Sequence, residues 1–94
     1  MNIKNLEENF EAAKRLKVKY VGVLIEMPGF EKPEVIINEN KNFDSKLDYY
    51  RSAYDEDLNH KHAPGIKITG FTYGNFFAGI EEDLVIDNVL SSPT

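Results

Sequence analysis

The residues with the richest chemistry in this sequence lie between positions 55 and 62. The segment reads Asp-Glu-Asp-Leu-Asn-His-Lys-His, so three carboxylates and both histidines of the chain fall within eight residues. Asp57, His60 and His62 offer oxygen and nitrogen ligands, and alternate residues of an extended segment point to one side, as a zinc site requires. The segment therefore predicts either a metal site or a solvated acidic loop, because Lys61 places a cation among the proposed ligands.

Several other chemistries are excluded by the residues present. The chain has no cysteine, which excludes disulfides and thiolate catalysis. The spacing of residues 55, 57 and 59 imitates a calcium loop, but His60 stands where such a loop needs glycine and Ile66 where it needs glutamate. No nucleophile elbow, zinc-protease helix or P-loop is present. We therefore expect no cofactor, and no motif in the sequence specifically supports catalysis.

A second group of residues combines aromatic and arginine side chains. Tyr49, Arg51 and Tyr54 fall on an expected helix, where Tyr50 and Tyr54 share one face and Tyr49 turns away. Tyrosine and arginine are enriched in binding hot spots, although Tyr50 and Tyr54 can instead be core residues with hydroxyls at the rim. Phe30 lies in an expected turn, where it either folds back over the core or reaches a partner. The candidate contact residues are Phe30, Tyr49, Arg51 and Tyr54.

Charge and hydropathy limit the kinds of partner. The formal net charge is −5, yet residues 1–19 hold five Lys or Arg against three Glu, and residues 81–87 hold four acids and no base. A protein that neutralises phosphates needs a basic face, so we expect no direct binding to nucleic acid. The longest apolar run, residues 20–25, is too short to span a bilayer, and residues 1–10 lack a signal-peptide core. We expect a cytoplasmic protein that does not engage a membrane.

The hydrophobic period predicts a helix and then a hairpin in the first part of the chain. Residues 3–16 carry apolar side chains at helical spacing, and Asn2 or Asn5 can cap the start. Residues 18–25 form a β-branched and aromatic run that is apolar on both faces at its centre. Pro28 and Gly29 suit a type II turn, and a second strand follows over residues 35–37. Residues 18–38 thus predict a β-hairpin.

The second part of the chain predicts a helix, a strand and another helix. The helix over residues 43–55 can be capped by Asn42 or Asp44. A third strand is expected over residues 66–73, with a bulge at Gly70 that keeps its apolar side chains on one face. Residues 86–94 are expected to form a frayed tail. Before that tail, Asn75 can cap a helix whose apolar positions are Phe76 or Phe77, Ile80 and Leu84.

Together these elements predict one α+β domain over residues 1–94 with the order α-β-β-α-β-α. We expect a small, mainly antiparallel sheet of three strands in the order 2-1-3, with the helices packed on one face. Such a sheet has two open edges, so a homodimer through a sheet edge is expected.

Three functional hypotheses follow. The first is a small acidic interaction protein, of the accessory or phage-encoded kind, that binds and modulates a protein or a small-molecule ligand. A narrower version blocks a basic, nucleic-acid-binding surface of that partner. The second is a metal-binding protein or enzyme that uses the segment 55–62. The third is a homo-oligomeric structural protein whose partner is itself.

Overall fold

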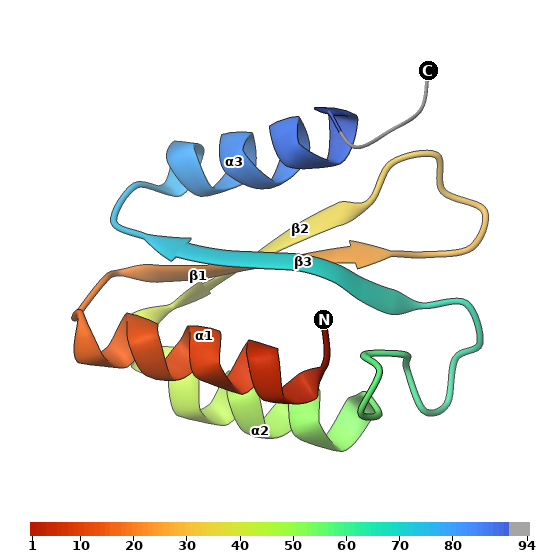
Figure 1. The fold of residues 1–94 in the computed structure, drawn as a ribbon, viewed down its shortest axis with the longest axis horizontal. Coiled ribbons are helices and arrows are strands. Elements are labelled where there is room, and N and C mark those ends of the chain that lie inside the picture. Colours follow the sequence, from red (N-terminus) through yellow and green to blue (C-terminus); the bar gives the residue numbers. More distant parts are fainter. Residues whose placement is uncertain (91–94) are drawn as a thin grey trace.

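Three helices and a three-stranded sheet make up the fold, in the order α-β-β-α-β-α (Figure 1). The computed structural model describes the backbone of residues 1–90 and the side-chain surroundings of residues 1–84. A single 3-10 turn precedes the second helix. The elements are α1 (Ile3–Arg15), β1 (Tyr20–Glu26), β2 (Glu34–Glu39), η1 (Asn40–Asn42), α2 (Phe43–Ala53), β3 (Lys67–Gly74) and α3 (Phe77–Leu90).

Local sequence fixes where α1 begins. The Asn2 side chain accepts a hydrogen bond from the backbone N–H of Asn5 at 2.9 Å, and the Asn5 side chain accepts one from the N–H of Asn2 at 2.9 Å. This reciprocal capping box satisfies two N–H groups that the first turn of a helix leaves unpaired. Asn42 immediately precedes α2, and no side chain forms a capping hydrogen bond there. Neither Asn42 nor Asp44 therefore caps the helix as expected.

The sheet is antiparallel throughout and has the predicted strand order 2-1-3 (Figure 1). The hairpin turn holds Gly29 at φ +83°, and the N–H of Phe30 donates to the carbonyl of Met27 at 3.3 Å, as in a type II turn. The register between β1 and β3 shifts after Leu24, which faces Gly70. The predicted bulge is therefore present. It lets Ile66, Ile68 and Phe71 join one core.

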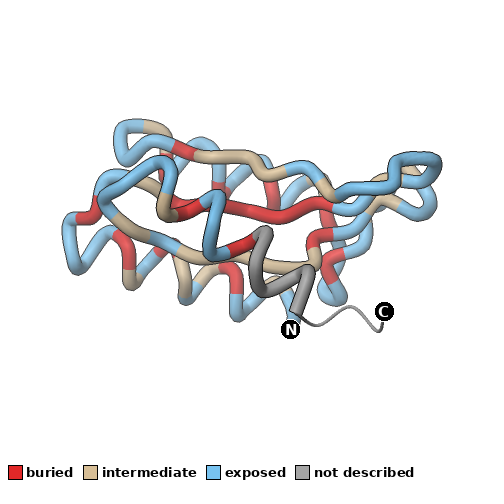
Figure 2. The backbone as a smooth tube through the Cα atoms, turned by 90° about the horizontal axis from the view of Figure 1, so that it is seen from above, coloured by how far each residue is buried: buried red, intermediate tan, exposed pale blue. Residues whose placement is uncertain are grey.

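Helices cover both faces of the sheet, which corrects the expectation that they pack on one face (Figure 1). α1 and α2 lie against Val21, Val23 and Ile25, whereas α3 lies against Leu24 on the opposite face. Figure 2 shows β1 as a run of buried residues through the middle of the molecule. Because β1 is apolar on both faces at its centre, a helix layer on one side alone would leave Leu24 exposed to water.

Hydrogen bonds between residues far apart in sequence stabilise the larger core, which lies between the sheet and helices α1 and α2. The Asn9 side chain of α1 donates to the carbonyl of Thr72 in β3 at 3.2 Å. Asn38, the one buried polar residue in the described part of the chain, donates to the carbonyl of Val21 at 3.1 Å and accepts from the Tyr50 hydroxyl at 3.5 Å. These bonds satisfy polar groups that would otherwise be buried without a partner.

The third helix is longer than the sequence predicts. α3 is bounded by Phe77 and Leu90, so the segment 86–94, expected as a frayed tail, begins within the helix, and residues 91–94 lie outside the described residues. Among residues 1–90, none of the helices combines the length and the hydropathy that a bilayer crossing requires.

Candidate functional site

The acidic segment 55–62 forms a turn in which a side chain of the segment hydrogen-bonds to the segment's own backbone. The Asp55 carboxylate accepts hydrogen bonds from the N–H groups of Asp57 at 2.9 Å and Asn59 at 3.0 Å. Leu58, between them, is buried at 1% exposure in the left-handed region with φ +66°. The Asp-x-Asp-x-Asn spacing that imitated a calcium loop is therefore the signature of an Asx-type turn that anchors Leu58 in the core.

The two histidines belong to the same turn. The His60 ring lies edge-on to Tyr54 with 5.1 Å between ring centroids, and its Nδ1 accepts the N–H of His62 at 3.1 Å. Asp57 and His62 are exposed, and His60 is half-buried. Within the described residues no three His, Asp or Glu side chains converge as metal ligands. The structure therefore does not bring Asp57, His60 and His62 together as a ligand set.

The four predicted contact residues do not form one surface. Tyr54 is a core residue with 3% exposure, and burial raises the pKa of its hydroxyl. Tyr49 is 52% exposed on α2 and packs edge-on against Tyr50 with centroids 5.4 Å apart. Phe30, in the β1–β2 turn, is 67% exposed and does not fold back over the core. Figure 1 places this turn away from α2, so Phe30 and Tyr49 face different surroundings.

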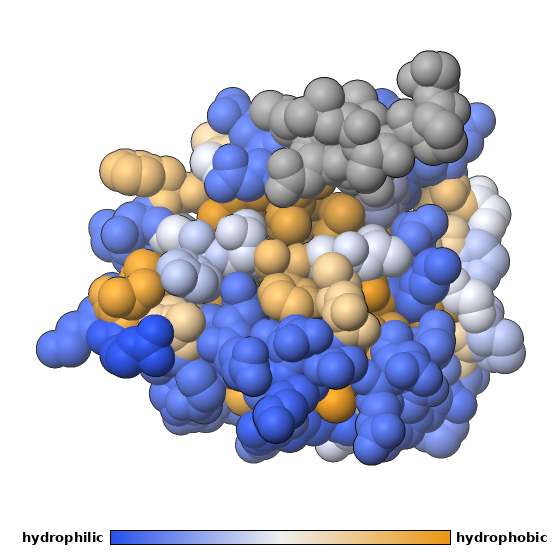
Figure 3. Space-filling model, in the orientation of Figure 1, coloured by the Kyte–Doolittle hydropathy of each residue, from blue (hydrophilic) through white to orange (hydrophobic). Residues whose placement is uncertain are grey.

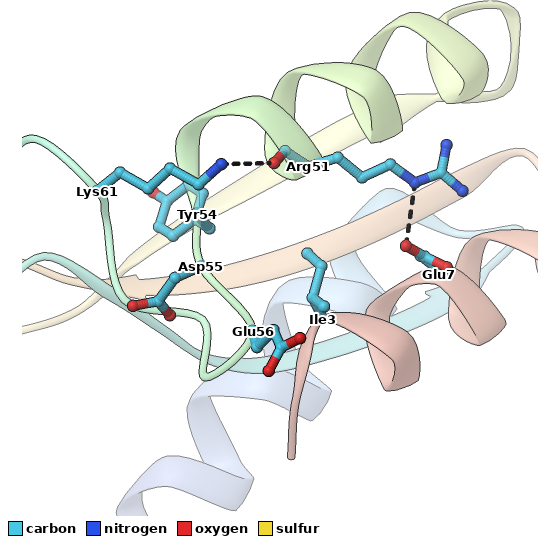
Figure 4. Close-up of a pocket in the computed structure, with 7 residues that line it drawn as sticks. All are labelled: Ile3, Glu7, Arg51, Tyr54, Asp55, Glu56 and Lys61. Atoms are coloured by element: carbon cyan, nitrogen blue, oxygen red, sulfur yellow. Dashed lines mark hydrogen bonds and ion pairs between the residues drawn. The ribbon is translucent and has the colours of Figure 1, made fainter.

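Arg51 lies at a shallow hollow of about 380 Å³ between α1, α2 and the segment 55–61, lined by charged side chains together with Ile3 and Tyr54 (Figure 4). Its Nε donates to a Glu7 carboxylate oxygen at 3.0 Å, and this hydrogen bond raises the pKa of the guanidinium. Lys61 Nζ donates to the carbonyl of Arg51 at 3.4 Å. Both cations of the hollow thus have partners within the protein, and Asp55 is committed to its turn. The hollow therefore offers a ligand no unpaired cation among the described residues.

Large apolar side chains gather instead at the end of the sheet where α1 leads into β1 and β3 leads into α3. Phe76 is 79% exposed, Leu16 55%, Phe77 54% and Tyr73 37%. Figure 3 shows apolar atoms in orange next to deep blue hydrophilic atoms at this end, on the left of the view. We call this surface the aromatic end and define it by Leu16, Tyr20, Tyr73, Phe76 and Phe77.

Two contacts hold the halves of the aromatic end together. The N–H of Lys19 donates to the Asn75 side chain at 3.1 Å, so Asn75 bonds to the α1–β1 junction. The expectation that Asn75 caps α3 is wrong, because α3 begins at Phe77 and the carbonyl of Phe76 accepts the first helical N–H, that of Ile80, at 3.2 Å. The rings of Tyr20 and Phe77 meet edge-to-face with centroids 5.8 Å apart, and Tyr20 pairs with Gly74 across the sheet. This edge-to-face packing fixes Phe77 at the surface.

The α1–β1 junction carries backbone strain at Lys17. The N–H of Val18 donates to the carbonyl of Ala13 at 3.1 Å, and the N–H of Lys17 donates to the carbonyl of Lys14 at 3.2 Å. These two bonds form a Schellman motif, whose left-handed position is usually glycine. Here Lys17 occupies that position at φ +57°. A lysine at this position carries a backbone cost that glycine would avoid.

Lysines frame the aromatic end. Lys14 pairs with Asp44 at 2.7 Å, and Lys41 pairs with Glu39 at 3.3 Å. Lys17 and Lys19 are exposed and make no ion pair with any residue that the structure describes. On a chain with net charge −5, these two lysines create a local positive region beside apolar side chains.

Sequence reasoning missed the aromatic end because it assigned either Phe76 or Phe77 to the inner face of a helix and left the position of the other open, whereas both are exposed. A signal was present: two adjacent phenylalanines cannot both face inward, since successive helical residues are about 100° apart. Ile80 and Leu84 occupy the inward positions of α3. The remaining aromatic side chains therefore had to lie at the surface.

Comparisons with protein-family models, curated proteins and solved structures find no match to this chain.

Proposed function

We propose that this protein is a non-enzymatic interaction protein that binds another protein through the aromatic end and modulates it. The observation that carries the proposal is that Leu16, Tyr73, Phe76 and Phe77, each exposed, all lie at the end of the sheet where α1 leads into β1 and β3 leads into α3. Monomeric proteins rarely present several large apolar side chains together, and such groups mark interaction surfaces.

The energetics favour a protein partner. Full burial of one Phe or Leu side chain contributes about 1.5 to 3 kcal/mol, so two or three of them supply a useful share of a micromolar affinity. Aromatic anchors surrounded by polar groups are the usual composition of a binding hot spot. Lys17 and Lys19 supply the polar surroundings and favour a partner that carries carboxylates there.

The test compares two variants in affinity capture from a lysate of the source cells. The first variant, Leu16→Ser with Phe76→Ser, removes the two most exposed side chains of the aromatic end. Phe30→Ser is the matched control, because Phe30 is 67% exposed and lies at the opposite end of the sheet. Circular dichroism and urea unfolding establish that both variants fold.

We expect wild type and Phe30→Ser to capture the same protein, identified by mass spectrometry, and the aromatic-end variant to lose it. The purified partner is then assayed with and without this protein, and a change in its activity is the expected modulation. Equal capture by all three proteins would refute the assignment of the surface. Capture lost only with Phe30→Ser would move the binding site to the β1–β2 turn.

A further inference from the structure

We propose that the β1–β2 turn of one copy binds the aromatic end of a second copy, so that the protein assembles head to tail. The proposal goes beyond binding to a different protein and shares with it only the aromatic end as a binding surface. It starts from Phe30, which is 67% exposed in the turn between β1 and β2. An exposed phenylalanine at the tip of a hairpin is an anchor that can enter a partner's apolar surface.

The two surfaces lie at opposite ends of the same molecule. β1 begins at the aromatic end and leads to the turn that carries Phe30 (Figure 1). A contact between different surfaces of identical chains is heterologous, so each bound copy leaves one free turn and one free aromatic end. Such a contact gives a series of oligomers, or a ring if the rotation between copies closes.

Charge complementarity selects a second copy as the occupant. Glu26, Glu31 and Glu34 lie exposed around Phe30, with Lys32 as the cation within the turn and Lys67 opposite Glu26 across the sheet. None of these five residues forms an ion pair with a described residue. With three Glu against two Lys, these residues have a net charge of −1. This sign is opposite to that of Lys17 and Lys19, which are also free of ion pairs in the described part of the chain.

The geometry of the turn adds to the argument. Pro28 and Gly29 set its shape, with Gly29 at φ +83°. Gly65 approaches Pro28 so closely that a Cβ atom at position 65 would collide with the proline ring. Pro28 is thus packed against the neighbouring loop, which limits the backbone freedom that the turn loses on binding.

The experiment is sedimentation velocity and native mass spectrometry of the full chain from low micromolar to near-millimolar concentration. We expect a concentration-dependent series of multiples of 10.8 kDa. Phe30→Ser disables the turn and Leu16→Ser with Phe76→Ser disables the aromatic end. Each variant alone is expected to weaken self-association by roughly ten- to hundredfold.

Mixing the two variants gives the decisive result. The turn-disabled copy still has its aromatic end, and the other copy still has its turn, so the mixture is expected to form a dimer that cannot grow. Tyr49→Ser, on an exposed residue of α2, is the control and should self-associate like wild type. Its loss of assembly would place the contact on α2 instead.

Three results would overturn the proposal. One is a wild-type protein that stays monomeric at every concentration, which leaves binding to another protein standing. A second is an oligomer that both variants retain, as pairing through a sheet edge would produce. A third is a mixture of variants that remains monomeric although wild type assembles.

Discussion

Lys19 and Asn75 are joined by a hydrogen bond across 56 positions of the sequence, with the Lys19 N–H donating to the Asn75 side chain at 3.1 Å. Lys19 immediately precedes β1 and Asn75 immediately follows β3, so the bond joins the two junctions that form the aromatic end. The surface proposed for binding is thus held in part by one side-chain acceptor at an exposed position.

Replacing this acceptor should loosen the aromatic end. In Asn75→Ala we expect the free energy of unfolding to fall by about 0.5 to 1.5 kcal/mol, the usual contribution of one hydrogen bond. Hydrogen exchange of the Lys19 amide should become faster. Asn75→Asp keeps an acceptor oxygen and should retain the slower exchange. Unchanged protection of the Lys19 amide in Asn75→Ala would contradict the role of this bond.

Lys17→Gly should stabilise the protein. Glycine adopts the left-handed backbone of residue 17 without steric cost, and we expect a gain of about 1 kcal/mol in urea unfolding. Lys19→Gly is the matched control, because Lys19 is an exposed lysine of the same junction that lacks a positive φ. That control should lose stability through the flexibility of glycine in the unfolded chain. If both variants are destabilised equally, the strain at Lys17 is not real.

Gly22 sets the distance between α3 and the sheet. A Cβ atom at this position would collide with the Cγ2 atom of Ile80 and come within 3.0 Å of a Leu84 methyl group. Gly22→Ala should therefore cost about 1 to 3 kcal/mol by overpacking. A Cβ atom at Gly79 meets only ordinary contacts, the nearest being 3.7 Å from the Phe76 Cβ. Gly79→Ala should stabilise α3 by about 0.5 to 1 kcal/mol, and thermal unfolding of both variants checks the contrast.

Alkaline pH should unfold the protein partly through Tyr50. Burial raises the pKa of its hydroxyl from about 10 to about 12, although the hydrogen bond to Asn38 opposes the shift. The unfolded chain then loses the proton before the folded one, so the stabilisation is complete below pH 10 and disappears as pH rises through 12. The loss amounts to about 2 to 3 kcal/mol. Urea unfolding from pH 9 to 12 should show a shallower decline in Tyr50→Phe, and parallel declines would count against this assignment.

Most of the fold could be predicted from the sequence because its elements carry strong local signals. The helical period of α1, the β-branched run of β1 and the Pro28-Gly29 turn gave the element order and the strand order. The distribution of helices over the two faces was wrong, although the apolar character of both faces of β1 indicated it. The deciding contact, Leu24 with Ile80 and Leu84, joins residues about sixty positions apart and has no local signature.

The candidate site was harder to predict, because side-chain chemistry does not reveal how a side chain is used. Asp55 looks like a metal ligand in sequence, whereas its carboxylate bonds to the backbone N–H groups of its own turn. Tyr54 looks like a contact residue and is buried. Tyr49 and Arg51 are exposed as expected, and Phe30, for which the sequence left folding back over the core open, is exposed as well. The aromatic end depends on junctions that come together through the sheet.

The strand order also determines when this fold can form during synthesis. β1 can pair with β2 soon after both leave the ribosome. Its other edge stays unpaired until β3, which begins at Lys67, has been synthesised. The hydrogen bond from the Asn9 side chain to the Thr72 carbonyl likewise cannot form before Thr72 is present. At about 5 to 20 residues per second, the central strand remains open along one edge for roughly a few seconds. During that interval the nascent chain exposes its most apolar segment to the cell, and closing the sheet removes this exposure.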